Sequence, residues 1–129
     1  MFINISNHPM GRWSSEQKEG VSNKGYSSIT EIPFPQVDPA MDKEDVSKLA
    51  MDIIYQLGEI LDVKGISPSE VTLHIMGEQS LFYILTHICK DLGYTVVVST
   101  SRREAVEKVL PNGEVEKTSV FKFIQFREV

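Results

Sequence analysis

Residues 71–85 of the chain read VTLHIMGEQSLFYIL, and this stretch decides the fold. Its first half is an apolar run interrupted only by Thr72 and His74, which is typical of a buried strand. After a turn at residues 77–80, apolar side chains recur at helical spacing over residues 81–92. A buried strand followed at once by an amphipathic helix predicts a parallel α/β unit.

Strands and helices also alternate on both sides of this stretch. Three further apolar or β-branched runs predict strands over residues 2–6, 28–34 and 95–99. Two further segments predict helices: a short one from about Ser15, and a long amphipathic one after Asp42 that ends near Lys64. For the short helix, Ser14 and Gln17 fit a capping box.

The tail of the chain changes character. Residues 103–110 and 115–127 predict the two arms of a β-hairpin around an Asn112-Gly113 turn. Alternation along the second arm divides its apolar side chains between two faces, with Phe121 and Phe123 on one and Ile124 and Phe126 on the other.

Length and composition agree with one globular domain. The chain has 129 residues, of which 41% are hydrophobic and 24% charged. The order of elements predicts a single Rossmann-like three-layer α/β domain over residues 1–129. Its sheet is expected to be mainly parallel, with right-handed crossovers and a C-terminal β-hairpin.

The charge and cysteine content exclude several classes of protein. A formal net charge of -5 disfavours a protein that coats long nucleic acid, although a small anion can still be held by a few N–H groups and one or two arginines. The single cysteine, Cys89, excludes an internal disulfide and a Cys-based metal site, and we expect no cofactor. The first residues lack a secretion signal, and no apolar run approaches a membrane span, so we expect a cytoplasmic protein without a membrane partner.

The predicted topology also indicates where a ligand would bind. In an open parallel sheet, ligands bind beyond the carboxyl ends of the strands, where the strand order reverses. If the four predicted strands lie in the spatial order 2-1-3-4, the reversal falls between the first and the third. The loop containing His8 and the turn containing Gly77 would then flank one crevice.

Two kinds of side chain near this crevice suit catalysis on a phosphate. Histidine titrates close to neutral pH, so His8 is the candidate for proton transfer, with a local hydrogen-bonding role as the alternative. Arg102 and Arg103 follow the fourth strand and are candidates for holding a phosphate, unless they are a solvated basic pair. His74, inside a strand, and His87, on the polar side of a helix, fit structural or solvent-facing roles better.

Other groups could complete a binding site. The N–H groups from Gly77 to Ser80 begin a helix and favour an anion, but Glu78 would repel it unless it caps the helix or faces a ribose hydroxyl. Trp13 could stack on a base or brace the loop. The remaining candidate ligand contacts are polar side chains: Ser6, Asn7, Ser80, Thr100 and Ser101.

Several short motifs resemble known protein groups. The run Asn4-Ile5-Ser6-Asn7-His8-Pro9, with Trp13 and Gln17 behind it, resembles a group of small, largely uncharacterised bacterial proteins. The resemblance to this group extends to three further segments of the chain: Met76-Gly77-Glu78, Ser99-Thr100-Ser101-Arg102 and Phe126-Arg127-Glu128. The pattern Ser-x-His-Pro followed by Trp is also similar to one small CRISPR-associated family with a Rossmann-like fold, which belongs with the ring nucleases. It is carried by Ser6, His8, Pro9 and Trp13.

Ring nucleases bind or cleave cyclic oligoadenylate messengers, and the resemblance implies a metal-independent phosphodiesterase. A ribose 2′-hydroxyl would attack its neighbouring phosphate and leave a 2′,3′-cyclic phosphate. His8 would then transfer protons, Arg102 or Arg103 would hold the phosphate, and amides near Gly77 would add donors. A two-fold symmetric ring suits a homodimer. Two alternatives stay open: a non-catalytic nucleotide-sensing module, and a protein-interaction domain that uses the phenylalanines of the hairpin.

Overall fold

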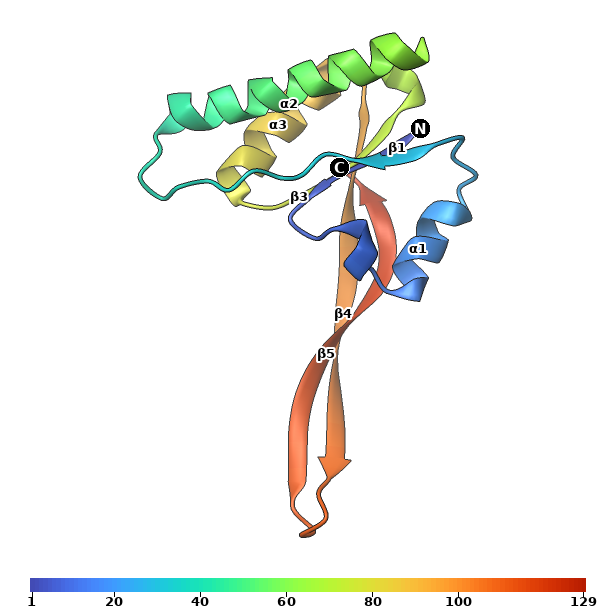
Figure 1. Cartoon of the computed structure of the whole chain (residues 1–129). Helices are drawn as coiled ribbons and strands as arrows, with labels where there is room; N and C mark the ends of the chain where they lie inside the picture. Colours follow the sequence, from blue (N-terminus) through green and yellow to red (C-terminus); the bar gives the residue numbers. More distant parts are fainter.

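A computed structural model describes residues 1–129 and contains one five-stranded sheet with three α-helices (Figure 1). The strands lie in the order β2 (Ile29–Glu31), β1 (Phe2–Ser6), β3 (Thr72–Met76), β4 (Thr95–Val109) and β5 (Val115–Glu128). The first four are parallel to one another, whereas β5 is antiparallel to β4. The condition set above, a spatial order of 2-1-3-4 for the first four strands, is therefore met, within a sheet that is mixed.

The three helices pack on the two faces of this sheet (Figure 1). Helices α2 (Lys43–Lys64) and α3 (Gln79–Asp91) cover the larger core, and α1 (Ser15–Ser22) covers the smaller one. Because side chains alternate along a strand, Ile3 of β1 enters the larger core while Phe2 enters the smaller one. None of the helices is long and apolar enough to cross a membrane.

Side-chain caps set where the helices begin. Asp42 accepts a hydrogen bond from the Asp45 N–H at 2.9 Å, and the Asp45 carboxylate accepts one from the Asp42 N–H at 3.2 Å. This reciprocal pair confirms Asp42 as the N-cap of α2. Ser14 caps α1 by accepting a hydrogen bond from the Gln17 N–H. The predicted capping box is only half formed, because the Gln17 side chain donates to Ser99 of the sheet instead of returning to Ser14.

Strand β2 is shorter than the predicted run over residues 28–34. After Glu31, the last residue of β2, only the Ile32 N–H continues the pairing with β1, and it donates to the Asn4 carbonyl at 2.8 Å. Pro33 and Pro35 have no N–H to donate, which explains why the ladder ends there.

Strand β4 includes two segments that we predicted as separate strands. It is one continuous strand of 15 residues, where we predicted a strand over 95–99 and a separate hairpin arm over 103–110. Its outer half and β5 form a two-stranded ribbon that projects from the rest of the molecule, and we call residues 104–120 of this ribbon the arm (Figure 1). The predicted turn is confirmed, with Gly113 at a φ of +85°.

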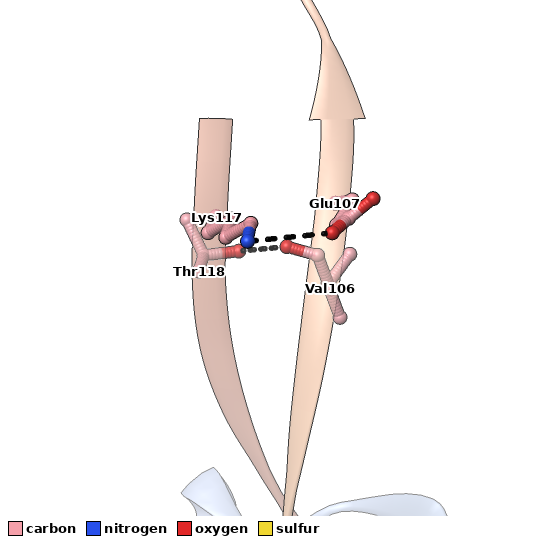
Figure 2. A network of polar contacts seen from close by, with 4 residues as sticks. All are labelled: Val106, Glu107, Lys117 and Thr118. Atoms are coloured by element: carbon pink, nitrogen blue, oxygen red, sulfur yellow. Dashed lines mark hydrogen bonds and ion pairs between the residues drawn. The ribbon is translucent and has the colours of Figure 1, made fainter. Parts of the chain in front are cut away.

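The arm is held by exposed contacts between its two strands. Figure 2 shows Lys117 paired with Glu107, with 3.8 Å between the ammonium nitrogen and the carboxylate oxygen. Beside this pair, the Thr118 hydroxyl donates to the Val106 carbonyl at 3.5 Å. Exposed ion pairs of this kind contribute little to stability, typically less than about 1 kcal/mol.

A β-bulge corrects one prediction about the aromatic residues. The register between β4 and β5 shifts between Thr100 and Ser101, so that Ile124 is an extra residue in β5. The extra residue reverses the alternation of side chains along the strand. The rings of Phe123 and Phe126 therefore lie together, 5.0 Å apart, and the prediction that they occupy opposite faces is wrong.

Candidate functional site

A pocket of about 410 Å³, which we call the site pocket, lies at the carboxyl ends of β1 and β3 and at residues 99–101 in the middle of β4, beside α1. It gathers one guanidinium, two imidazoles, several hydroxyls and two phenyl rings in a chain of negative net charge. Its lining residues are Ser6, Asn7, His8, Arg12, Ser14, Gln17, His74, Met76, Ser99, Thr100, Ser101, Phe121 and Phe123.

A second pocket of about 690 Å³ lies beside the first and is lined by Asn7, Glu78 and the segment 34–39. Asn7 lines both pockets, and its N–H donates to the Met76 carbonyl at 3.1 Å. The first loop and the β3–α3 turn therefore flank one crevice, as the strand order predicts. The charged groups of this second pocket are the carboxylates of Asp38 and Glu78, which disfavour an anionic ligand.

The loop after β1 is fixed through the backbone of His8. The His8 carbonyl accepts hydrogen bonds from the Ser6 hydroxyl at 3.0 Å, the Trp13 indole N–H at 2.9 Å and the Asn4 amide at 3.3 Å. Trp13 is buried and braces the loop, and it is not among the residues that line the site pocket. The side chain of His8 stays exposed at the pocket.

Beneath the site pocket, five polar side chains form a chain of hydrogen bonds that we call the His74 network. The Ser99 hydroxyl lies 2.6 Å from His74 Nε2, and His74 Nδ1 lies 2.8 Å from Asn4 Oδ1. At one end Gln17 Nε2 donates to Ser99 Oγ at 3.1 Å, and at the other Asn4 Nδ2 donates to Glu31 Oε2 at 3.0 Å.

One arrangement of protons satisfies all of these bonds. The Asn4 amide nitrogen is the donor to Glu31 and to the His8 carbonyl, so Asn4 Oδ1 is left as an acceptor. His74 Nδ1 therefore carries the proton, and His74 Nε2 presents a lone pair. Because His74 Nε2 has no proton, the Ser99 hydroxyl donates to it, while Ser99 Oγ accepts from Gln17.

The imidazole of His74 is uncharged at neutral pH. Burial, reinforced by the nearby charge of His8, lowers the pKa of His74 to about 4 from an ordinary value of 6.5. Only 1% of His74 is exposed to solvent, which makes the charged form costly. At neutral pH the ring can accept a proton at Nε2, and the buried network pays no cost for an unpaired charge.

The turn before α3 is closed by its own side chains. Glu78 accepts hydrogen bonds from the N–H groups of Ser80 at 3.1 Å and Leu81 at 2.9 Å, and these bonds together with the Ser80 hydroxyl lower the pKa of Glu78. Glu78 thus caps the helix whose N–H groups we expected to face a phosphate. A Cβ on Gly77 would lie 2.4 Å from the ring of Phe34, so this glycine allows close packing.

The two arginines of β4 lie outside the lining of the site pocket. Arg103 is opposite Phe121 in the ribbon, with its guanidinium 5.7 Å from the ring centroid, and Phe121 does line the pocket. Arg102 is opposite Lys122 and, by strand alternation, faces away from Ser101 and Arg103. The cationic side chain that does line the pocket comes from the first loop and is Arg12.

Comparison with known protein families matches residues 1–127 to the Uncharacterized protein MJ1673 family. The chain belongs to this family. No curated protein and no solved structure matches it. The resemblance to CRISPR-associated ring nucleases stays a prediction, so the chemistry of this MJ1673-family protein has to be argued from its geometry.

Five candidate residues that the sequence predicted for this MJ1673-family protein line the site pocket, whereas the His74 network was missed; the five are Ser6, Asn7, His8, Thr100 and Ser101. Asn4 and His74 are polar residues inside two buried strands, and both occupy positions that alternate with core isoleucines. This parity, which places them on one face of adjacent strands, was the available signal. Arg12 carried a weaker signal, since it follows His8 in the same loop.

Proposed function

We propose that this MJ1673-family protein is a Rossmann-like phosphodiesterase that binds a cyclic oligonucleotide in the site pocket and cleaves it by attack of a ribose 2′-hydroxyl on the neighbouring phosphate. One observation carries the proposal. At the reversal of strand order, a pocket in an acidic chain combines Arg12 and His8 with hydroxyls and the rings of Phe121 and Phe123.

Each group has a role in this reaction. A guanidinium pairs with a phosphate through two parallel hydrogen bonds, so Arg12 would hold the scissile phosphate. Phenyl rings offer stacking surfaces for bases, which suits Phe121 and Phe123. His8 would transfer a proton between the reacting oxygens, and its exposed ring at the pocket suits that role.

The size of the site pocket favours one nucleotide unit over a whole ring. Its volume of about 410 Å³ lies near the lower end of the range for ligand pockets, about 300–1,000 Å³. The rest of a cyclic ligand would extend beyond the pocket, where a second copy of the chain could supply the matching half. This supports the homodimer that two-fold symmetry of the ring suggests.

The direct test is to incubate the purified protein with cyclic tetraadenylate or hexaadenylate and to separate the products by chromatography with mass detection. We expect linear products that end in a 2′,3′-cyclic phosphate. Binding without turnover would favour the nucleotide-sensing module. The absence of both binding and turnover would contradict the proposal.

The variant His8→Ala tests the assigned proton transfer. Loss of a general acid or base lowers a rate by about 100- to 10,000-fold, so we expect a loss of that order while the affinity is kept. His87→Ala is the matched control because His87 is exposed on α3 and pairs only with Asp91. A cleavage rate that His8→Ala leaves unchanged would remove His8 from the mechanism.

The arm supports a second candidate function, that of an interaction surface. Its apolar side chains Val106, Val109, Val115 and Val120 are exposed, between 42% and 71% each. A two-stranded ribbon is at best marginally stable alone in water, so a covered arm would be more stable than a free one. We infer that the arm pairs with a second copy of the chain, which is compatible with the phosphodiesterase.

A further inference from the structure

The Ser99 hydroxyl is held as a nucleophile is held in enzymes that act through a covalent intermediate. Such sites place a base against the hydroxyl and a third group against the base, each within hydrogen-bond reach. Here the base is His74, 2.6 Å from Ser99 Oγ, and the third group is Asn4, 2.8 Å from the other ring nitrogen. The three come from adjacent strands, β4, β3 and β1.

The hydrogen bonds around this triplet also point the Ser99 proton at the base. His74 Nδ1 donates to Asn4 Oδ1, so His74 Nε2 presents a lone pair and the Ser99 hydroxyl is the donor in the bond between them. A hydroxyl in this arrangement loses its proton to the imidazole as its oxygen attacks.

Exposure differs along the triplet in the way that catalysis requires. His74 and Asn4 are each 1% exposed, whereas Ser99 is partly exposed, and His74 and Ser99 both line the site pocket. The base and its partner are thus shielded from water, and the oxygen that would attack reaches the ligand space. Ser101, which lies on the same face of β4, has no hydrogen bond to a base and serves as the internal comparison.

We propose that Ser99 is the nucleophile of a covalent phosphoryl-transfer reaction, with His74 as general base and Asn4 as the positioning residue, and that its substrates are phosphodiesters without a 2′-hydroxyl. Arg12 lines the same pocket and can pair with the phosphate oxygens, which favours a phosphodiester over an uncharged ester. This activity goes beyond the 2′-hydroxyl route, because the attacking oxygen comes from the protein.

The reaction balances in two steps. In the first, a bond forms between Ser99 Oγ and phosphorus, the bond to one ester oxygen breaks, and the Ser99 proton passes through His74 Nε2 to the departing alcohol. In the second, water attacks phosphorus and gives a proton to His74, and Ser99 Oγ leaves and takes that proton back. The net result is hydrolysis of one ester bond by one water molecule.

Diisopropyl fluorophosphate tests the nucleophile independently of any natural substrate. Attack by Ser99 Oγ forms an oxygen–phosphorus bond and releases fluoride, which leaves one diisopropylphosphoryl group on the protein. Intact mass and peptide mapping should place a single group on Ser99, at a rate at least roughly 100-fold above that of Ser101, as general-base assistance predicts. Absence of the label from Ser99, or equal labelling of the two serines, would overturn the proposal.

Variants distinguish activation of the Ser99 hydroxyl by His74 from mere accessibility of Ser99 to the reagent. Ser99→Ala should abolish labelling and His74→Gln should slow it by roughly 100-fold, whereas Ser69→Ala, at an exposed serine outside the site pocket, should leave it unchanged. Circular dichroism verifies folding, and if His74→Gln does not fold, the ratio of Ser99 to Ser101 labelling in the unaltered protein still decides. A folded His74→Gln variant that labels at the original rate would contradict the role of His74.

Bis(p-nitrophenyl) phosphate, a phosphodiester without a 2′-hydroxyl, tests the substrate class. We expect slow release of p-nitrophenol that Ser99→Ala abolishes, and for Asn4→Ala a fall in kcat with KM unchanged, which loss of a merely structural contact would not produce. No release by a protein that labels at Ser99 would overturn the phosphodiester assignment. If cyclic oligoadenylates are not cleaved while Ser99 labels, the 2′-hydroxyl route fails alone. If the unaltered protein cleaves them but does not label at Ser99, the nucleophile fails alone.

Discussion

His74 couples the stability of the fold to pH. Its pKa is about 4 in the folded protein and near 6.5 in an unfolded chain, so the unfolded state binds a proton first as the pH falls. Folding stability is therefore complete above about pH 6.5 and declines as the pH falls toward 4. A shift of this size corresponds to about 3 kcal/mol of unfolding free energy.

Urea denaturation at pH 7 and pH 4.5 measures this decline. His74→Asn removes the titrating ring and should show a smaller loss of unfolding free energy between the two pH values than the unaltered protein. His87→Asn is the control, because His87 is exposed on α3 and its replacement should leave the pH dependence intact. The same pH dependence in the unaltered protein and in His74→Asn would exclude His74 as the source.

We expect the guanidinium of Arg12 to contribute to the affinity for a phosphate-bearing ligand. Removing a charged hydrogen-bond partner of a phosphate costs about 1.5–3 kcal/mol, so Arg12→Ala should weaken binding of a cyclic oligoadenylate by roughly 10- to 100-fold. Arg127→Ala is the matched control, since Arg127 is exposed on β5 and lines none of the pockets described above. Calorimetric titration distinguishes them, and equal affinities would remove Arg12 from the site.

Among the elements, the turn between β3 and α3 is the most tightly constrained. A side chain at Gly77 would overlap the ring of Phe34, so Gly77→Ala should destabilise the protein by about 1–3 kcal/mol. The cost should shrink in a Phe34→Ala background, where the ring is gone. Gly58→Ala, in open space within α2, should instead stabilise by about 0.5–1 kcal/mol. Thermal unfolding of Gly77→Ala, Phe34→Ala, the double variant and Gly58→Ala tests this. If Gly77→Ala lowers the stability equally with and without the Phe34 ring, the account is contradicted.

The elements that the sequence predicted are those that local signals specify. Helices α2 and α3 follow from apolar periodicity and from caps such as Asp42, and the parallel pairing of the first four strands follows from the alternation of strands with helices. The bulge at Ile124 and the continuity of β4 depend on pairing between distant segments, which periodicity within one segment does not report. For the same reason the His74 network was missed, because Asn4 and His74 are 70 residues apart in the chain.

For the whole molecule, we propose that the arm forms the contact between two copies of the chain. If its exposed valines cover a second copy, replacing Val109 and Val115 by serine should convert a dimer into a monomer without lowering the melting temperature by more than a few degrees. The reason is that neither valine belongs to the two cores. Light scattering coupled to size-exclusion chromatography measures the mass, and a monomeric unaltered protein at micromolar concentration would contradict this role of the arm.

The central claim is that phosphate-bearing ligands bind in the site pocket, where β1 and β3 end beside residues 99–101 of β4. Titration of isotope-labelled protein with cyclic tetraadenylate, followed by amide chemical shifts, tests it most directly. The claim predicts that the perturbed amides cluster in the first loop around His8 and Arg12 and at Ser99 to Ser101. Unchanged spectra, or changes confined to the arm or to the outer face of α2, would contradict it.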